Sequence, residues 1–555
     1  MAAERTEIGD ILNERFKGVR HNRGSWEGHW RECAQYVYPQ ADDFWQTAGR
    51  SSHGEKKNQR IYDATAMLSN GQFASVLEST LVPRHQMWHN LTIEDPIVMR
   101  DRSSMEWLQL ANETLFRKRY ASLANFQMQI GETFMSIGAF GTGCIFVDDV
   151  LGTGPRYRSR FLGDIYFDVD DAGIVDTVFD RFDFSSKQAV ERWGENAPEQ
   201  AIKGLDNDPY QRHEYIRVVL PNPDQDPDRM DAAGMPLMSV IISLEDGVTC
   251  EIGGYRTMPY AIGRYQTSPH EIYGRGPAMS VLPDIRTLNE MARADLRATH
   301  KLIDPPLLVH DDGILGVGRQ EILLDPGMVN FGGVTMDGRP LIQPLQTGAR
   351  VDLNEAKMEV KRDVIKKAFL VNMFEILENK PRMTATEVLA RAQEKAALLG
   401  PTMGRIQSEL LGPIIQRELE LLFDMDALPP VPAMIADAMQ MDNLQITYES
   451  PLSRMQQAES MGGIDMLIQQ AVQLAQVGQT EVLDAINGPA IMDMIARGTG
   501  APVEVLRSPE EIAAIQQQRQ QQEQQAMQAE QIQGQAGAMK DLAQAEQISQ
   551  ETGAM

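Results

Sequence analysis

Residues 273–303 read YGRGPAMSVLPDIRTLNEMARADLRATHKLI, and this segment with the one after it is the most informative about the architecture. Apolar residues recur in it at helical spacing from about residue 278. The sequence DPP at 304–306 ends the helix, because proline rings cannot continue it. Glycines and prolines up to about residue 348 predict a small strand-and-turn unit, and residues 351–369 predict a second helix. We therefore expect two helices that hold a small β-rich unit between them.

A connector and a long bent helix follow. Residues 370–383, LVNMFEILENKPRM, predict the connector, and Thr384 with Glu387 forms a capping box at the start of a helical pattern that continues to about residue 424. Gly400-Pro401 and Gly412-Pro413 interrupt the pattern, and proline inside a helix kinks it. The sequence predicts one bent helix or three short ones in a line.

The C-terminal part changes composition twice. PPVP at 429–432 marks a boundary, and a mostly helical unit follows to about residue 510. Residues 511–555 contain 15 glutamines and few large apolar residues. Such a segment cannot bury enough surface to fold alone, so we expect a solvated helix or disorder.

The N-terminal half predicts helices and then strands. Residues 1–50 predict a helix and a loop, with an aromatic cluster that we interpret as core packing or a subunit contact: Trp26, Trp30, Tyr36, Tyr38 and Trp45. Residues 58–82 and 104–137 predict helices. From 144 to 265, short apolar runs alternate with Gly, Pro and Asp clusters, which is typical of short strands and turns.

The charge balance limits the function classes. The chain carries 52 Lys and Arg against 78 Asp and Glu, a formal net charge of −26. A sequence-independent DNA-binding protein is normally basic, so an ordinary one is disfavoured, whereas a channel through which DNA slides is not. The three cysteines form no CxxC pair, and no stretch approaches roughly 18 consecutive apolar residues. We expect no disulfide framework, no membrane span, and assembly in a cytoplasm.

Two motifs suggest chemistry, and neither matches a known site. The stretch GAFGTG at 138–143 precedes an apolar run and Asp148-Asp149, but it fits neither GxGxxG nor GxxxxGK[ST], so a turn before a strand is favoured. A metal site would use His300, His310, Asp311 and Asp312. Their spacing fits no zinc pattern, and Asp-Asp-Gly is more simply a turn. We expect no catalytic residue, no cofactor and no metal, and hence no enzyme.

A basic pattern is more informative. The first of the paired helices carries four basic residues at offsets of 7, 4 and 4: Arg286, Arg293, Arg297 and Lys301. At 100° per residue they share one face about 80° wide. The second helix ends in another basic cluster: Lys361, Arg362, Lys366 and Lys367. The favoured interpretation is a solvated or salt-bridging face. The alternative is contact with phosphate or with an acidic partner subunit.

The order of segments resembles the portal, or head-to-tail connector, proteins of short-tailed bacteriophages of the podovirus type. The resemblance covers about residues 30–515 and rests on five segments in order. They are RIYDATAMLSNGQFASVLESTLVPRHQMWHNL at 60–91, the helix at 273–303, the turn DPPLLVHDDG with its β-rich unit, the bent helix beginning PRMTATEVLARAQEKAALLG at 381, and ITYESPLSRMQ at 446–456.

The resemblance implies an α+β, mainly helical portal fold with a wing, a two-helix stem, a β-rich clip, a long kinked helix and a helical crown. The implied segments are the wing at 50–270, stem helix 1 at 271–303, the clip at 304–349, stem helix 2 at 350–369, the tunnel loop at 370–383, the long kinked helix at 384–428 and the crown at 429–510. From the residues alone we expect an N-terminal helical arm at 1–49 before them and the glutamine-rich tail at 511–555 after them.

The same resemblance implies a function in the virion. It implies a dodecameric ring at one capsid vertex, the head-tail junction, through which double-stranded DNA passes during viral genome packaging and ejection. The implied partners are the large terminase as packaging motor, the major capsid protein and scaffold, tail adaptor or nozzle proteins, and internal ejection proteins. The alternatives are another virion structural protein, such as a tail adaptor or internal core protein, and a DNA-packaging nucleotide hydrolase, for which we find no phosphate loop.

Candidate site residues follow from this assignment. The tunnel loop would bring Lys380 and Arg382 to the DNA channel. Further basic candidates for the channel or for a subunit contact are Arg293, Arg297, Lys301, Lys366 and Lys367. Candidates for docking of the motor and adaptors at the clip are Asp311, Asp312, Arg319 and Glu321.

Overall fold

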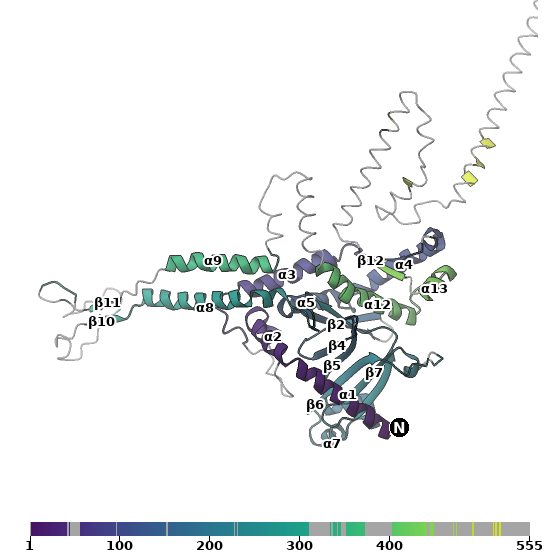
Figure 1. Ribbon diagram of the computed structural model, residues 1–555, viewed down its shortest axis with the longest axis horizontal. Helices are drawn as coiled ribbons and strands as arrows, with labels where there is room; N and C mark the ends of the chain where they lie inside the picture. The colour runs from purple at the N-terminus through teal and green to yellow at the C-terminus, as the bar shows by residue number, and fades with distance from the viewer. Residues whose placement is uncertain are drawn as a thin grey trace, which may run out of the picture. The chain divides into compact units, whose positions relative to one another are not determined.

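The chain is mixed α and β, in agreement with the expected α+β class (Figure 1). The computed structural model describes residues 2–41, 44, 56–95, 97–150, 154–226, 228–229, 231–309, 334, 337–340, 342–345, 351–371, 402–440 and 444–448, with isolated positions between 470 and 522. The chain divides into two compact units: residues 1–89 with 113–428, and residues 90–112 with 429–555.

Most of the helices that the structure describes belong to the first unit. They are α1 (Ala2–Asn22), α2 (Gly24–Val37), α3 (Thr65–Leu81), α5 (Phe126–Phe140), α6 (Ser186–Trp193), α7 (Glu199–Asn207), α8 (Pro277–Ile303), α9 (Val351–Ala368), a π-helical turn (Gln407–Leu411) and α12 (Gly412–Asp424). Helix α4 (Arg102–Arg119) runs from the second unit into the first.

The strands form small antiparallel sheets. A five-stranded sheet has the order β4-β5-β6-β7-β8, from β4 (Ile165–Val169), β5 (Val175–Ser185), β6 (Arg212–Pro221), β7 (Leu237–Ser243) and β8 (Thr249–Tyr255). A three-stranded sheet has the order β3-β2-β9, from β2 (Thr142–Val150), β3 (Gly154–Arg160) and β9 (Tyr260–Arg264). Two short strands, β10 (Leu307–Val309) and β11 (Ile342–Pro344), pair with each other.

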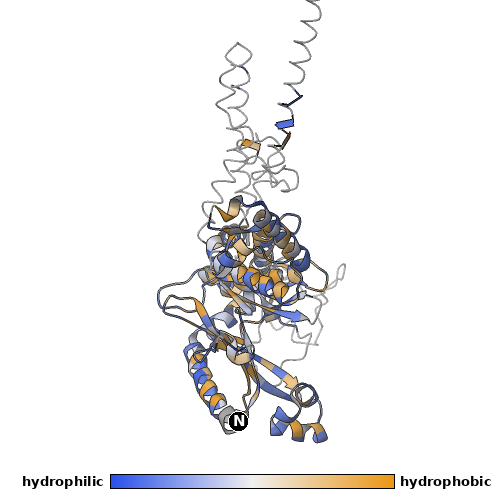
Figure 2. Ribbon diagram, turned by 90° about the vertical axis from the view of Figure 1, so that its right-hand side faces the viewer, coloured by the Kyte–Doolittle hydropathy of each residue, from blue (hydrophilic) through white to orange (hydrophobic). Residues whose placement is uncertain are grey.

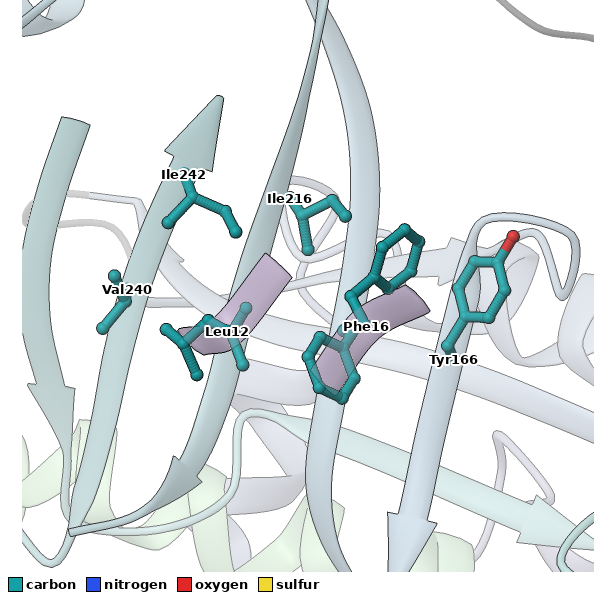
Figure 3. Close-up of a cluster of buried hydrophobic side chains, with 8 residues drawn as sticks. Leu12, Phe16, Tyr166, Ile216, Val240 and Ile242 are labelled. Carbon is teal, nitrogen blue, oxygen red and sulfur yellow. The ribbon is translucent and has the colours of Figure 1, made fainter. Parts of the chain in front are cut away.

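Helix α1 covers one face of the five-stranded sheet. Successive side chains of a strand point to opposite faces, so Ile216 and Val218 of β6 share one face and Tyr215 lies on the other. Leu12 and Phe16 of α1 pack on the face of Ile216 (Figure 3). Burying a side chain such as Phe16 contributes roughly 1.5–3 kcal/mol, so this contact holds the N-terminal helix on the sheet.

Helices α6 and α7 lie over the opposite face. The buried cluster there consists of Ala189, Trp193, Ala197, Ala201, Tyr215, Ile241 and Cys250. Helix α6 begins with a capping box in which Ser185 and Gln188 bond reciprocally to the backbone. The sequence predicted only strands and turns here, which is wrong for these two helices. With 8 and 9 residues they are too short to show a clear helical period.

Two other predicted helices differ in their bounds. The segment 104–137 is not one helix, because the chain breaks between α4 and α5, where Asn125 takes a left-handed conformation with φ 62°. The segment 58–82 becomes helical only at α3, after the Asp63 carboxylate accepts a hydrogen bond from the backbone N–H of Thr65 at 2.9 Å. Short polar side chains that bond locally to the backbone favour helix starts over helix interiors.

The second unit contains β12 (Leu444–Tyr448), α13 (Ala433–Gln440), the first part of α4, and all of β1 (His89–Ile93) except His89. Strands β1 and β12 pair, although about 350 residues separate them. The Thr92 and Thr447 hydroxyls lie 2.9 Å apart across the pair. The Trp107 indole N–H donates to the Pro429 carbonyl at 3.1 Å. This bond joins α4 to the first residue of the PPVP sequence.

Hydrophobic and hydrophilic residues alternate along the described elements, as expected for helices and strands with one buried side (Figure 2). The cysteines Cys33, Cys144 and Cys250 are buried and free, in line with the expected lack of a disulfide framework.

Candidate functional site: the paired helices α8 and α9

Helices α8 and α9 form an antiparallel pair that carries most of the candidate basic residues. The pair runs side by side, with β10 and β11 at its far end (Figure 1). Lys361 of α9 forms an ion pair with Asp284 of α8. Farther along, the Asn354 amide donates to the Asp295 carboxylate at 3.2 Å and to the Met291 carbonyl at 3.4 Å. These contacts fix which face of each helix meets the other. The two predicted helices are present, and of the β-rich unit predicted between them the structure describes the β10–β11 pair.

Glycines let the N-terminal end of α8, called its root below, pack closely against the C-terminal end of α5. Gly141 ends α5 with φ 77°, a conformation that side chains rarely adopt. A Cβ on Gly141 would lie 2.3 Å from the Gly276 nitrogen and 2.4 Å from the Gly274 oxygen. The Thr142 hydroxyl accepts a hydrogen bond from the Gly274 N–H at 2.9 Å. The stretch 138–143 therefore consists of the end of α5, the cap Gly141 and the first two residues of β2, where a turn before the strand was predicted, and it lets two backbones meet where α8 begins.

Aromatic rings continue this root. The Trp30 ring lies 5.0 Å from the ring of Tyr273, edge to face, and 5.7 Å from that of Phe44. Trp30 is fully buried. This confirms core packing as the interpretation for that member of the N-terminal aromatic cluster, whereas Trp45 lies outside the described residues.

Polar contacts anchor both helices on the segment before α3. The buried Asn289 side chain of α8 accepts from the Tyr62 N–H at 2.7 Å and donates to the Arg60 carbonyl at 3.0 Å. Arg362 of α9 pairs with Asp63 at 2.9 Å. Burial alone would raise the pKa of Asp63, but hydrogen bonds from Thr65 and the Arg362 guanidinium lower it below its ordinary value. Arg362 is therefore a structural cation.

The basic stripe of α8 lies on the exposed side of the helix pair. Arg286 pairs with Glu32 at 3.3 Å, and Arg293 pairs with Glu290 at 3.5 Å. The Arg293 guanidinium also lies 5.6 Å from the centre of the Tyr62 ring, and its Nε has no hydrogen-bond partner among the described residues. The salt-bridging interpretation therefore describes the first half of the stripe.

The other basic candidates have no such partner. Within the described ranges, no carboxylate lies at ion-pair distance from the following cations: Arg297, Lys301, Lys366 and Lys367. Arg297, Lys301 and Lys367 are exposed, and Lys366 is half-buried. The basic cluster predicted at the end of α9 therefore divides into two structural cations, Lys361 and Arg362, and two further lysines.

An acidic stripe on α9 was not singled out from the sequence. Glu355, Glu359 and Asp363 follow one another at offsets of four residues, so they share one face, and all three are exposed. Glu359 pairs with Arg362 of the same helix at 3.1 Å. The i, i+4 spacing was visible in the sequence, but acidic residues are so frequent in this chain that the spacing alone did not stand out.

A buried ionic cluster fixes α12 on the first unit. Arg119 of α4 and Glu418 of α12 form a bidentate pair, with the Arg119 Nε at 2.8 Å and 3.1 Å from the two carboxylate oxygens. Both side chains are buried, and the Tyr157 hydroxyl also bonds to Glu418. Nearly 300 residues separate the partners, so sequence spacing gave no sign of this cluster.

His89 completes this cluster. Its Nε2 lies 2.7 Å from an Arg119 terminal nitrogen. Burial, together with the positive charge of Arg119, holds the pKa of His89 well below its ordinary value. The imidazole is therefore neutral at neutral pH, and its Nε2 accepts a hydrogen bond from Arg119.

Several predicted residues lie outside the described part of the chain. They are Asp311, Asp312, Arg319 and Glu321 of the predicted clip, and Lys380 and Arg382 of the predicted tunnel loop. His310 lies outside it as well, and His300 is exposed on α8. Among the described residues, no group of three or more His, Cys, Asp or Glu side chains could hold a metal ion. No described helix is both long and apolar enough to span a membrane.

The chain was compared with known protein families. Residues 10–506 match the family described as "Bacteriophage head to tail connecting protein". The chain belongs to this family. The match confirms the resemblance drawn from the five ordered segments, and it gives the chain the role of a head-to-tail connector in a phage particle.

Two curated relatives match the connector over nearly its whole length. The "Probable portal protein" of Bordetella phage BPP-1 is 26% identical over 537 residues, covering 95% of this chain and 94% of the relative. The "Portal protein" of Salmonella phage epsilon15 is 24% identical over 524 residues, covering 92% of this chain and 90% of the relative.

One solved structure, titled "Virion of native gene transfer agent (GTA) particle", matches with a TM-score of 0.34 and 11% identity. It covers 80% of this chain and 95% of that chain. A score this low carries no argument about the fold.

Proposed function

We propose that this connector is the subunit of a portal: a ring of twelve copies at one capsid vertex, through which double-stranded DNA enters and leaves the head. The observation that carries the proposal is the near full-length match to two phage proteins that are named portal proteins. The ring would stand at the head-tail junction, in contact with the major capsid protein and scaffold.

The charge of the chain supports passage of DNA through such a ring. A formal net charge of −26 gives a mean field that repels phosphate, so DNA would slide without adhering. A few cations per subunit would then position the duplex, since each phosphate contact adds salt-dependent affinity. We assign this role to Lys380 and Arg382 in the segment 370–383.

A packaging assay tests this DNA contact. Replacing Lys380 and Arg382 together by Ala should leave oligomers intact and impair packaging or retention of DNA. Unchanged packaged length and retention in the double variant would reject a DNA role for these charges. A matched control replaces Lys187 and Lys203, two exposed lysines of α6 and α7, by Ala.

The segment 304–349 is the proposed docking site for the large terminase and later for tail adaptors or nozzle proteins. Its described ends, β10 and β11, pair at the far end of α8 and α9, where a partner could reach it. Deleting 308–345 should abolish motor docking and leave the five-stranded sheet folded. If the shortened protein still packaged DNA, the assignment would be wrong.

Native mass spectrometry tests the ring itself. Purified protein at micromolar concentration should give closed rings, mostly near twelve times the chain mass of 62.0 kDa, with some of thirteen copies. Only monomers and dimers would contradict the proposal and would favour a tail adaptor or internal core protein. A chain truncated after residue 515 should form the same rings, because the glutamine-rich end lies outside the matched family region.

A further inference from the structure

The two outer flanks of the α8–α9 pair carry opposite charge. On α8, the side chains that contact α9 include Asp284 and Asp295. The basic stripe of Arg286, Arg293, Arg297 and Lys301 is centred about 150° away from them at 100° per residue. The stripe therefore points away from α9. In the part of the chain that the structure describes, Arg297 and Lys301 find no carboxylate, whereas Arg293 pairs with Glu290 of the same helix.

The acidic stripe of α9 points the opposite way. The side chains of α9 that face α8 include Asn354 and Lys361, and Glu355, Glu359 and Asp363 are centred about 150° away from them. Each stripe is more than a right angle from the neighbouring helix, so the two stripes lie on opposite flanks of the pair. One flank is positive, and the other is negative.

The stripes also overlap in height. The pairs Asp284–Lys361 and Asp295–Asn354 show which residues of the antiparallel helices are level. Glu355 and Glu359 are then level with the part of α8 around Arg286 to Arg293. Arg297 and Lys301 extend the basic stripe toward β10 and β11. A second hairpin placed beside the first would bring a positive flank against a negative one.

We propose that the basic stripe of α8 in one subunit pairs with the acidic stripe of α9 in the next. The proposal rests on the ring function proposed above and names the surfaces that its subunits use. The occupant of each flank is a second copy of this chain, because complementary charge is present on that same chain. A two-fold contact would set each stripe against itself and repel, whereas a head-to-tail contact sets opposite charges together and repeats until it closes.

Charge reversal tests the proposed contact. The variant Arg293→Glu/Arg297→Glu brings the net charge of the basic stripe from +4 to zero, because Arg286 and Lys301 remain. The variant Glu355→Lys/Glu359→Lys changes the acidic stripe from −3 to +1, because Asp363 remains. Arg286 is left unchanged because it pairs with Glu32 of another helix, α2, whereas among the described residues Arg293 and Glu359 form ion pairs only within their own helices. Each variant alone should lose rings in native mass spectrometry at a concentration where the wild type is fully assembled. The loss should be specific to assembly, so the far-UV circular dichroism spectrum per residue should match that of the wild type.

Mixing the two variants supplies the decisive arm. An equimolar mixture should regain rings in which the two chains alternate, and one chain that carries all four reversals should regain rings by itself. A control variant, Glu191→Lys/Glu199→Lys, reverses two exposed acids on α6 and α7 and should assemble as the wild type does.

Each remaining outcome separates the two proposals. Rings formed by both reversed variants as well as by the wild type would overturn the flank pairing and leave the portal function standing. If Arg293→Glu/Arg297→Glu formed rings but lost DNA retention, the stripe would contact DNA and the pairing would be wrong. Lost rings that neither the mixture nor the fourfold variant restores would also overturn it. A wild type without rings would instead overturn the portal function.

Discussion

The buried charges around Arg119 and the exposed charges on the α8–α9 pair differ in how their partners are supplied. Arg119 and Glu418 satisfy each other in one chain, with His89 and Tyr157 closing the cluster. A buried charge that lost its partner would be costly, so the chain must complete such a cluster itself. Exposed charges stay hydrated, so they need no partner in their own chain and remain available to another molecule. Exposed charges without a partner among the described residues of their own chain, such as Arg297 and Lys301, are therefore candidates for contact with another molecule, whereas the buried cluster is not.

The largest expected effect comes from breaking the buried pair. Glu418→Ala leaves the Arg119 guanidinium buried and unpaired, and should lower the free energy of unfolding by about 3–5 kcal/mol in urea denaturation. Asp424 lies on the same helix as Glu418 and forms an exposed ion pair with Arg256. Asp424→Ala removes that pair and should change the free energy of unfolding by about 1 kcal/mol or less. Equal losses in the two variants would mean that burial does not distinguish these pairs.

The root of the helix pair gives the next effect. Gly141→Ala would place a Cβ 2.3 Å from the Gly276 nitrogen in a backbone conformation with φ 77°, and should destabilise by roughly 1–3 kcal/mol. Gly71→Ala, in α3 with open space around it, should be neutral or stabilise by about 0.5–1 kcal/mol. Thermal unfolding of both variants measures the contrast. An unchanged Gly141→Ala protein would show that the close backbone approach is not required.

The buried cluster should also respond to pH through His89. Its folded-state pKa is depressed, so the unfolded chain binds the extra proton first, and stability is lost as pH falls below the unfolded value of about 6.5. This residue alone should lower the free energy of unfolding by about 1.4 kcal/mol per pH unit below that point. His89→Gln should remove that part of the slope between pH 6.5 and 5. Measurements at pH 8 separate the loss of the side chain from its titration, and parallel slopes would contradict the assignment.

The smallest effect belongs to an exposed pair at the start of the basic stripe. The Arg286 and Glu32 side chains are 57% and 49% exposed. Arg286→Gln removes their contact and should lower the free energy of unfolding by about 0.2–1 kcal/mol. Urea denaturation of the monomeric protein measures it. A loss as large as that of Glu418→Ala would abolish the distinction between the two kinds of charge.

The sequence predicted the helix pair well because its signals are local. Leu282, Ile285 and Leu288 keep a helical period, and Asp304-Pro305-Pro306 ends it. The order of segments identified the family of phage connectors, and the family match over residues 10–506 confirms it. Helices α6 and α7 were missed because two turns give too little periodicity. The Arg119–Glu418 pair was missed because only the fold brings residues so distant in sequence together.

The basic candidates show the same limit. Their common face on α8 followed from spacing alone, but spacing could not separate Arg362, which pairs with Asp63, from Lys367, which has no partner among the described residues. The predictions for Lys380, Arg382 and the clip residues concern positions outside those residues and stay predictions.

Chemical cross-linking tests whether the basic flank of one subunit lies against the acidic flank of the next. A chain with Arg293→Cys and Glu355→Cys carries one thiol on each flank, at nearly the same height, whereas the natural cysteines are buried. Treatment of assembled rings with a short bis-maleimide should give a denaturing-gel ladder that rises stepwise toward twelve linked chains, and either single-cysteine variant should give none. Rings that assemble but yield only monomers, or only dimers, would contradict the head-to-tail pairing of the basic and acidic flanks.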